Sequence, residues 1–173
     1  MKITLLIHEK EQRRPDNSGK LLHTLNEIDS NLHCETLLWQ RTQPNKALVE
    51  AIEKQQAILL RPAIDGAQPA QLQEIADISA IKHFIILDGT WQEARKMYNK
   101  SPYLKAANWH QLKDIPASQY NLRRNQIDEG LCTAECAIEI LKRINHQQAA
   151  EQLAEKFQQF LASDRANINF SQR

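Results

Sequence analysis

The chain has little glycine, little cysteine and no long apolar run, and each shortage argues against a class of protein. Its 173 residues include four glycines, and none of them forms a Gly-x-Gly-x-x-Gly pattern. This weighs against a dinucleotide site of the Rossmann type and against ATP hydrolysis. No segment approaches the roughly 18 consecutive apolar residues of a membrane span, so a membrane protein is not expected.

The three cysteines are odd in number and lack the spacing of a disulfide framework. The apolar start, residues 1–8, has no small-residue cleavage site and is better explained as a strand than as a signal peptide. Both observations favour a reduced, cytoplasmic protein. Cys132 and Cys136 share a helix face, but no further ligand is nearby, so we expect two small semi-buried residues and no metal.

Length and composition predict one globular domain over residues 1–173. The chain is 42% hydrophobic and 25% charged, enough to bury a substantial core. Strand-like segments alternate with segments of helical spacing, which predicts an α/β fold with a mainly parallel sheet flanked by helices. The expected strands lie near residues 2–8, 34–39, 56–60 and 82–87. The expected helices cover residues 18–28, 44–55, 69–77, a segment after Thr90, a segment from Thr133 as N-cap to 144, and 147–162.

Two further regions carry weaker patterns. Residues 62–66 are expected to form a loop, and residues 101–131 are less regular, with possible short strands at 109–112 and 120–122.

The most informative stretch runs from Ile85 to Met97. An apolar strand ends in Asp88, and Gly89-Thr90 lead into a helical pattern. In α/β proteins, ligands collect at the carboxyl ends of strands, which makes Asp88 and its neighbour Trp91 candidates for a site. A structural explanation is equally open, in which Asp88 caps the helix and Trp91 fills the core.

Basic side chains are concentrated between residues 91 and 124, although the whole chain carries only +1. This window holds seven basic and two acidic residues, so it carries +5 and the rest of the chain −4. We predict a surface for the phosphate backbone of a nucleic acid, with aromatic side chains that stack bases. The alternative is a solvated face with aromatics packed inward. The basic residues are Arg95, Lys96, Lys100, Lys105, Lys113, Arg123 and Arg124, and the aromatic residues are Tyr98, Tyr103, Trp109 and Tyr120.

Five blocks of sequence, in order from residue 8 to about residue 140, resemble the DTW-domain family. The family's signature is matched by Asp88-Gly89-Thr90-Trp91, followed by Ala94 and Lys96-Met97. The other blocks are His8-Glu9 with Arg14-Pro15-Asp16-Asn17-Ser18-Gly19-Lys20-Leu21, then Ser101-Pro102-Tyr103-Leu104, Tyr120-Asn121-Leu122-Arg123 and Leu131-Cys132-Thr133-Ala134-Glu135. The cysteine cluster that many members carry at the N-terminus has no counterpart in this sequence.

The resemblance implies a SPOUT-like fold with a C-terminal knot. It also implies an enzyme that moves the 3-amino-3-carboxypropyl group of S-adenosylmethionine (SAM) to N3 of a uridine in RNA, with tRNA as the expected partner and no metal. Uridine N3 carries a proton, so a carboxylate within about 2.6–3.2 Å can act as general base. Asp88 is the candidate, since partial burial at a strand end raises the pKa of a carboxyl group. The oligomeric state stays open.

The remaining candidate residues are assigned to the two substrates. For SAM they are Thr90, Trp91, Leu131, Thr133 and Glu135, where the helix start offers N–H groups to the SAM carboxylate and Glu135 a charge to its ammonium group. For RNA they are His8, Arg14, Asn17, Arg95, Lys96, Lys100, Ser101 and Arg123. Structural alternatives stay open: helix caps for Thr90 and Asn17, a plain turn at Ser101, and an ion pair of Arg123 with Asp128 or Glu129.

Three other functions fit parts of the sequence. A SAM-dependent RNA methyltransferase would share the fold and the donor, and a non-catalytic RNA-binding adaptor would keep only the fold. A flavodoxin-like small-molecule domain follows from the coarse α/β pattern alone, but the absence of a phosphate-cradling glycine loop argues against it.

Overall fold

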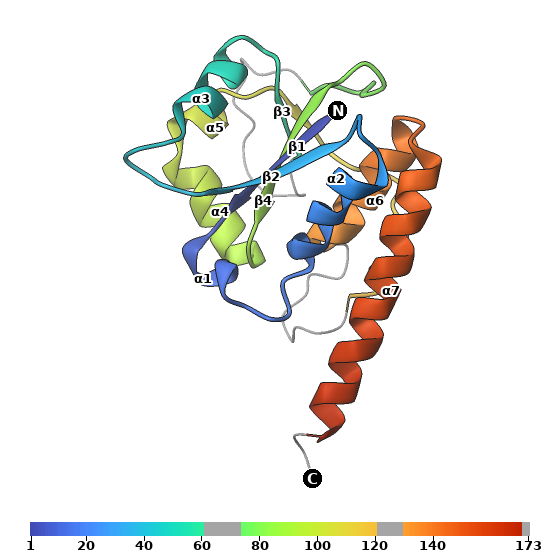
Figure 1. Ribbon diagram of the computed structural model, residues 1–173. Helices are drawn as coiled ribbons and strands as arrows, with labels where there is room; N and C mark the ends of the chain where they lie inside the picture. Colours follow the sequence, from blue (N-terminus) through green and yellow to red (C-terminus); the bar gives the residue numbers. More distant parts are fainter. Residues whose placement is uncertain (61–73, 121–129, 171–173) are drawn as a thin grey trace.

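One sheet of five parallel strands forms the centre of the protein in the computed structural model (Figure 1). The structure describes residues 1–60, 74–120 and 130–170, omitting the side chains after residue 163. The strand order is β2-β1-β4-β3-β5. The strands are β1 (Lys2–Ile7), β2 (His33–Leu38), β3 (Ile58–Leu60), β4 (His83–Asp88) and β5 (Trp109–His110). The α/β class, the parallel sheet and the four main strands, to within two residues at each end, confirm the prediction.

Helices cover both faces of the sheet, as Figure 1 shows. On one face lie α3 (Lys46–Glu53), α4 (Trp91–Lys100) and α5 (Pro102–Lys105). On the other lie the 3₁₀ helix η1 (Ser18–Thr24), α2 (Leu25–Ile28), α6 (Thr133–Arg143) and α7 (Gln147–Phe170). The one-turn helix α1 (Glu9–Gln12) follows β1. Within the described residues, no helix has the length and apolar character needed to span a membrane.

Successive residues of β4 contribute to two separate cores. Phe84 and Ile86 belong to the core beneath α6 and α7, whereas Ile85 and Leu87 belong to the core beneath α3 and α4. A strand points successive side chains to opposite faces. Because helices cover both faces here, the strand is apolar without interruption from Phe84 until it ends at Asp88.

Two predictions of local structure are wrong. Residues 74–77 are not helical, because the Ile75 N–H donates to the Trp109 carbonyl (2.8 Å) and this segment pairs with the edge strand β5. Thr133 is the first residue of α6 and not its N-cap. Cys132 holds the N-cap position, with an extended backbone (φ −74°, ψ 171°), and its N–H donates to Glu135.

Other expectations hold in part or fall outside the described residues. The helix expected over residues 18–28 begins as 3₁₀ turns before α2. The short strand expected at 109–112 is present as β5, whereas Tyr120 is not in a strand. The described residues do not include the loop expected at 62–66, residues 69–73 of the expected helix or residues 121–122 of the expected strand.

The carboxyl ends of β1 and β4 form a topological switch point. The chain leaves β1 through η1 and α2 towards β2, and it leaves β4 through α4 and α5 towards β5, on the other side of the sheet. Neighbouring strands whose connections diverge in this way leave a crevice where ligands bind in open α/β sheets. Ile7 pairs with Asp88 in the register, and the His8 N–H donates to the Asp88 carbonyl (3.0 Å).

At the amino end of β4, His83 makes the stability of the fold sensitive to acid. Burial lowers the pKa of His83 to about 4, and its Nε2 lies 2.8 Å from the Thr4 hydroxyl. Because the unfolded chain takes up this proton near pH 6.5, stability is lost as the pH falls from about 6.5 to about 4. After discounting for the partial exposure of the ring, we expect a loss of about 1–2 kcal/mol in urea unfolding. The variant His83→Gln should lack this pH-dependent loss of stability. The same pH profile in wild type and variant would contradict the assignment to His83.

Candidate active site at the carboxyl edge of the sheet

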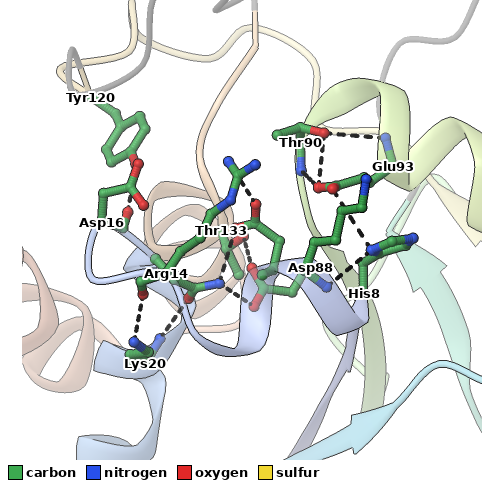
Figure 2. A network of polar contacts seen from close by, with 12 residues as sticks. His8, Arg14, Asp16, Lys20, Asp88, Thr90, Glu93, Tyr120 and Thr133 are labelled. Atoms are coloured by element: carbon green, nitrogen blue, oxygen red, sulfur yellow. Dashed lines mark hydrogen bonds and ion pairs between the residues drawn. The ribbon is translucent and has the colours of Figure 1, made fainter.

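The Asp88 carboxylate is the centre of a buried polar network, drawn in Figure 2. Its exposed fraction is 3%. Oδ2 accepts a hydrogen bond from Asn17 Nδ2 (2.9 Å), and Oδ1 accepts one from the Thr133 hydroxyl (2.7 Å). Asn17 is the N-cap of η1 and Thr133 begins α6. One carboxylate therefore joins three segments that are far apart in the sequence.

A second buried carboxylate lies next to this centre. Glu11, on α1, is 1% exposed and accepts a hydrogen bond from the same Asn17 Nδ2 (3.3 Å). The other oxygen of Glu11 forms an ion pair with Arg14 Nη1 (3.1 Å). The Asn17 amide oxygen accepts from the Lys20 N–H (3.2 Å), so its N-cap alternative is borne out alongside its contact with Asp88. No sequence pattern around Glu11 marks it as a site residue.

The backbone of Gly19 lies against the face of the Asp88 carboxylate. A Cβ at position 19 would lie 2.7 Å from Asp88 Oδ2 and 2.9 Å from its Cγ. Only glycine leaves room for the carboxylate to reach both Asn17 and Thr133.

Gly19→Ala should therefore destabilise the protein, because a methyl group would displace a carboxylate held by two donors. We expect a loss of about 1–3 kcal/mol in the free energy of unfolding, measured with urea. Gly89→Ala is the matched control: a Cβ there would lie 3.1 Å from Glu93 Cβ, a tight contact that a shift of a few tenths of an ångström relieves, so we expect a smaller loss. Equal losses in the two variants would show that the Asp88 contact is not the cause.

Asp16 and Ser18, just before and at the start of η1, are bonded to the C-terminal part of the chain. The Tyr120 hydroxyl donates to the Asp16 carbonyl (2.6 Å), and the Ser18 hydroxyl accepts from the Ala134 N–H in the first turn of α6 (3.3 Å). The two blocks around Arg14–Leu21 and Leu131–Glu135, which sequence alone could not connect, thus meet at Asp88.

Glu135 holds neighbouring backbone in place. Its carboxylate accepts hydrogen bonds from the Ser118 hydroxyl (2.7 Å), the Gln119 N–H (2.6 Å) and the Cys132 N–H (2.8 Å). It therefore closes the start of α6 and ties residues 118–119 to it. Leu131, directly before this helix, is buried.

Thr90 caps α4, the structural alternative left open for it. Its hydroxyl accepts from the Glu93 N–H (3.3 Å), and Glu93 Oε2 accepts from the Thr90 N–H (2.9 Å), which completes a capping box. The backbone N–H of Thr90, its hydroxyl and the nearby His8 keep the pKa of Glu93 low despite the opposing effect of burial. The start of α4 beside Asp88 is rigidly defined as a result.

An aromatic pair lies on the other side of the switch point. The His8 ring stacks on Trp39, with ring centroids 5.6 Å apart, and its Nδ1 lies 3.3 Å from the Lys10 N–H and 3.7 Å from Glu93 Oε1. The indole N–H of Trp39 donates to the Ser101 hydroxyl (2.9 Å), and Ser101 is 0% exposed. Ser101 is therefore a buried hydrogen-bond acceptor at the junction of α4 and α5.

Trp91, the first residue of α4, is partly exposed and packs against the backbone of Gly130. A Cβ at position 130 would lie 2.2 Å from Trp91 Cζ2. Trp91 is therefore not a fully buried core residue, and one part of its indole faces the segment that leads into α6.

The predicted base-stacking residues are mostly buried, so that expectation is wrong for three of the four. Tyr98, Trp109 and Tyr120 are 8%, 3% and 6% exposed and belong to the two cores. The apolar side of α4 faces the sheet and buries Tyr98 in the core that also contains Trp109 of β5. The basic side chains of Arg95, Lys96 and Lys100 are exposed on α4, and Arg123 and Arg124 lie outside the described residues.

The cysteine thiols are protonated at neutral pH. Burial, reinforced by nearby carboxylates, raises the pKa of Cys34 to about 12, and burial likewise raises that of Cys136 to about 12. Among residues 1–60, 74–120 and 130–163, no cluster of three or more His, Cys, Asp and Glu side chains is placed to hold a metal ion. The described site is one of carboxylates, an amide and hydroxyl groups.

Comparison with known proteins gives a consistent set of relatives. The model of the DTW domain matches residues 1–164. Proteins named tRNA-uridine aminocarboxypropyltransferase 2 match from Macaca fascicularis (28% identity over 144 residues, 78% of this chain and 47% of the relative) and Drosophila melanogaster (24% over 139 residues, 80% and 54%). The protein of that name from Mus musculus matches at 32% over 85 residues, 46% of this chain and 28% of the relative. The chain thus spans about half the length, or less, of these curated relatives. No solved structure matches it.

Proposed function

The chain belongs to the DTW-domain family, and we propose that it is a tRNA-modifying transferase. The proposed reaction moves the 3-amino-3-carboxypropyl group of SAM to N3 of a uridine, with tRNA as the acceptor. The observation that carries the proposal is the convergence of Asn17, Thr133 and Asp88 at the switch point of the sheet. The names of the relatives support the reaction class.

The residues at this edge of the sheet fit a substrate with the charges of SAM. The buried Asp88 carboxylate brings a negative charge to this place, which suits a molecule with a positive sulfonium. In the proposal, the start of α6 around Thr133 holds the SAM carboxylate, and Trp91 and Leu131 wall the pocket. We assign Glu135 to positioning residues 118–119, because three protein donors already bond to its carboxylate.

Asp88 is the proposed general base. SAM, when bound, supplies an electrophilic methylene group next to its sulfonium and leaves as methylthioadenosine. The Asp88 carboxylate takes the proton from uridine N3, which makes the nitrogen nucleophilic. The same carboxylate accepts hydrogen bonds from Asn17 and Thr133. Their role is to hold the oxygens in a fixed direction.

Positioning decides which group is transferred. The methyl and the aminocarboxypropyl carbons are attached to the same sulfur, so the enzyme must present the longer arm to uridine N3. Packing of Gly19 against Asp88 and of Gly130 against Trp91 leaves little freedom for the base or the wall of the pocket. A rigid site of this kind favours one orientation of the donor.

The exposed basic side chains of α4 are the proposed tRNA surface. Arg95, Lys96 and Lys100 lie on the helix that starts beside Asp88, so phosphates bound there would flank the reacting uridine. The SPOUT-like knot belongs to the same proposal. It is supported by the membership of the chain in the DTW-domain family, and a crystal structure of the protein tests it.

Incubation with carboxyl-labelled SAM and unmodified bulk tRNA, followed by nucleoside mass analysis, tests the function. Label retained on uridine with release of methylthioadenosine is the expected result. A methylated nucleoside would identify a methyltransferase instead. Salt-sensitive RNA binding without affinity for SAM would identify a non-catalytic RNA-binding protein.

A further inference from the structure

We propose that Glu11 is a positioning residue for the reaction: its buried carboxylate fixes the Asn17 amide in the orientation that donates to Asp88. The proposal rests on the proposed function in treating Asp88 as the base. The three residues concerned are Glu11 on α1, Asn17 in the segment after it and Asp88 at the end of β4.

The contacts of Asn17 determine which way its amide points. One side of the amide faces the Lys20 N–H (3.2 Å), which can only donate, so the oxygen must lie there. The other side faces Glu11 Oε2 (3.3 Å) and Asp88 Oδ2 (2.9 Å), so the nitrogen must lie there. Its two N–H groups serve one carboxylate each. A flipped amide would place an oxygen against two carboxylate oxygens.

The position of Glu11 is not explained by α1 itself. A carboxylate that is 1% exposed has lost nearly all of its hydration, a cost that a one-turn helix does not require. Arg14 neutralises it from the solvent side, at 3.1 Å from Oε1, and leaves Oε2 directed at Asn17. The Glu11 carboxylate therefore acts on Asp88, the proposed base, through the Asn17 amide that lies between them.

Glu11→Gln should lower kcat about ten- to a hundredfold with KM for SAM and tRNA nearly unchanged, because a misdirected base slows chemistry without weakening binding. Glu35→Gln is the matched control: it removes a partly buried carboxylate paired with Lys2 (2.9 Å) on β2, away from the site. We expect it to lower stability but not kcat. If Glu11→Gln does not fold, Glu11→Asp takes its place in the same measurement. It keeps the charge but withdraws the carboxylate from Asn17 by one methylene. A KM effect alone, or unchanged kcat, would overturn the proposal.

A measurement that needs no activity separates this proposal from the proposed function. In NMR spectra of the ¹⁵N-labelled protein, both side-chain amide protons of Asn17 should exchange slowly and should shift in Glu11→Gln, while the Glu35→Gln spectrum keeps them unchanged. An unperturbed Asn17 amide in Glu11→Gln would refute the positioning role even if wild-type protein modifies tRNA. A perturbed amide in a protein that transfers nothing would leave the geometry standing and refute the function.

Discussion

Replacing Asp88 by Asn should lower the rate of transfer to uridine about 10²–10⁴-fold, the usual contribution of a general base. Asn has nearly the same shape but no charge and no capacity to take the N3 proton. Its oxygen can still accept from the Thr133 hydroxyl, whereas its NH₂ group would meet the NH₂ group of Asn17. We therefore expect a folded protein that binds SAM, with a loss of stability of about 1–3 kcal/mol. Single-turnover nucleoside analysis and urea unfolding measure the two effects.

The control for this variant is Asp29→Asn, which changes the same group type between α2 and the amino end of β2, whereas the site lies at the carboxyl ends of the strands. Asp29 Oδ1 accepts from the Asn31 N–H (2.8 Å) in a local turn, so its loss touches neither substrate. Wild-type turnover in Asp88→Asn would remove Asp88 from the chemistry and leave it as the structural link between η1, β4 and α6.

The position of Asp88 could be predicted from the sequence because its cause is local. An uninterrupted apolar run indicates a strand covered on both faces, and the acid that follows must lie at the carboxyl edge of a parallel sheet. The alternation of strands and helices was likewise sufficient for the α/β class. These signals depend on residues within one turn or one strand of each other.

The partners of Asp88 could not be predicted in the same way. Asn17 and Thr133 are 71 and 45 residues away from it, and they meet there only because of the strand order β2-β1-β4-β3-β5. No periodicity in the sequence encodes that order. The prediction of Thr133 as an N-cap is wrong for the same reason, because its hydroxyl donates to Asp88 on β4 and not to a group of its own helix.

Glu11 could not be predicted as a site residue, because its neighbours in the sequence are typical of an exposed segment. It lies in Glu9-Lys10-Glu11-Gln12-Arg13, a charged stretch typical of a solvated turn. Its burial comes from Arg14 and Asn17 folding over it. The prediction for the aromatic residues is wrong in the opposite direction. Their place in a basic segment favours base stacking, but the pattern of α4 directs Tyr98 inward and the basic side chains outward.

Reversing three charges on α4, with Arg95, Lys96 and Lys100 each changed to Glu, should lower tRNA affinity about a hundredfold at low salt. Each lost phosphate contact removes about 0.7–0.9 from the slope of log affinity against log salt. The slope should therefore fall by about two to three, while the affinity for SAM stays the same. The three side chains are exposed, so the melting temperature should change little.

A control with the same change in net charge distinguishes a surface for tRNA from general electrostatic attraction. Lys54, Lys82 and Lys142 are exposed at the end of α3, before β4 and near the end of α6, all away from the carboxyl edge. Changing these three to Glu should reduce affinity far less, because counterions are released only where phosphates are bound. Equal losses in the two triple variants would assign tRNA binding to net charge alone. A selective loss on α4 would place the acceptor strand beside Asp88, where uridine N3 must lie for the proposed transfer.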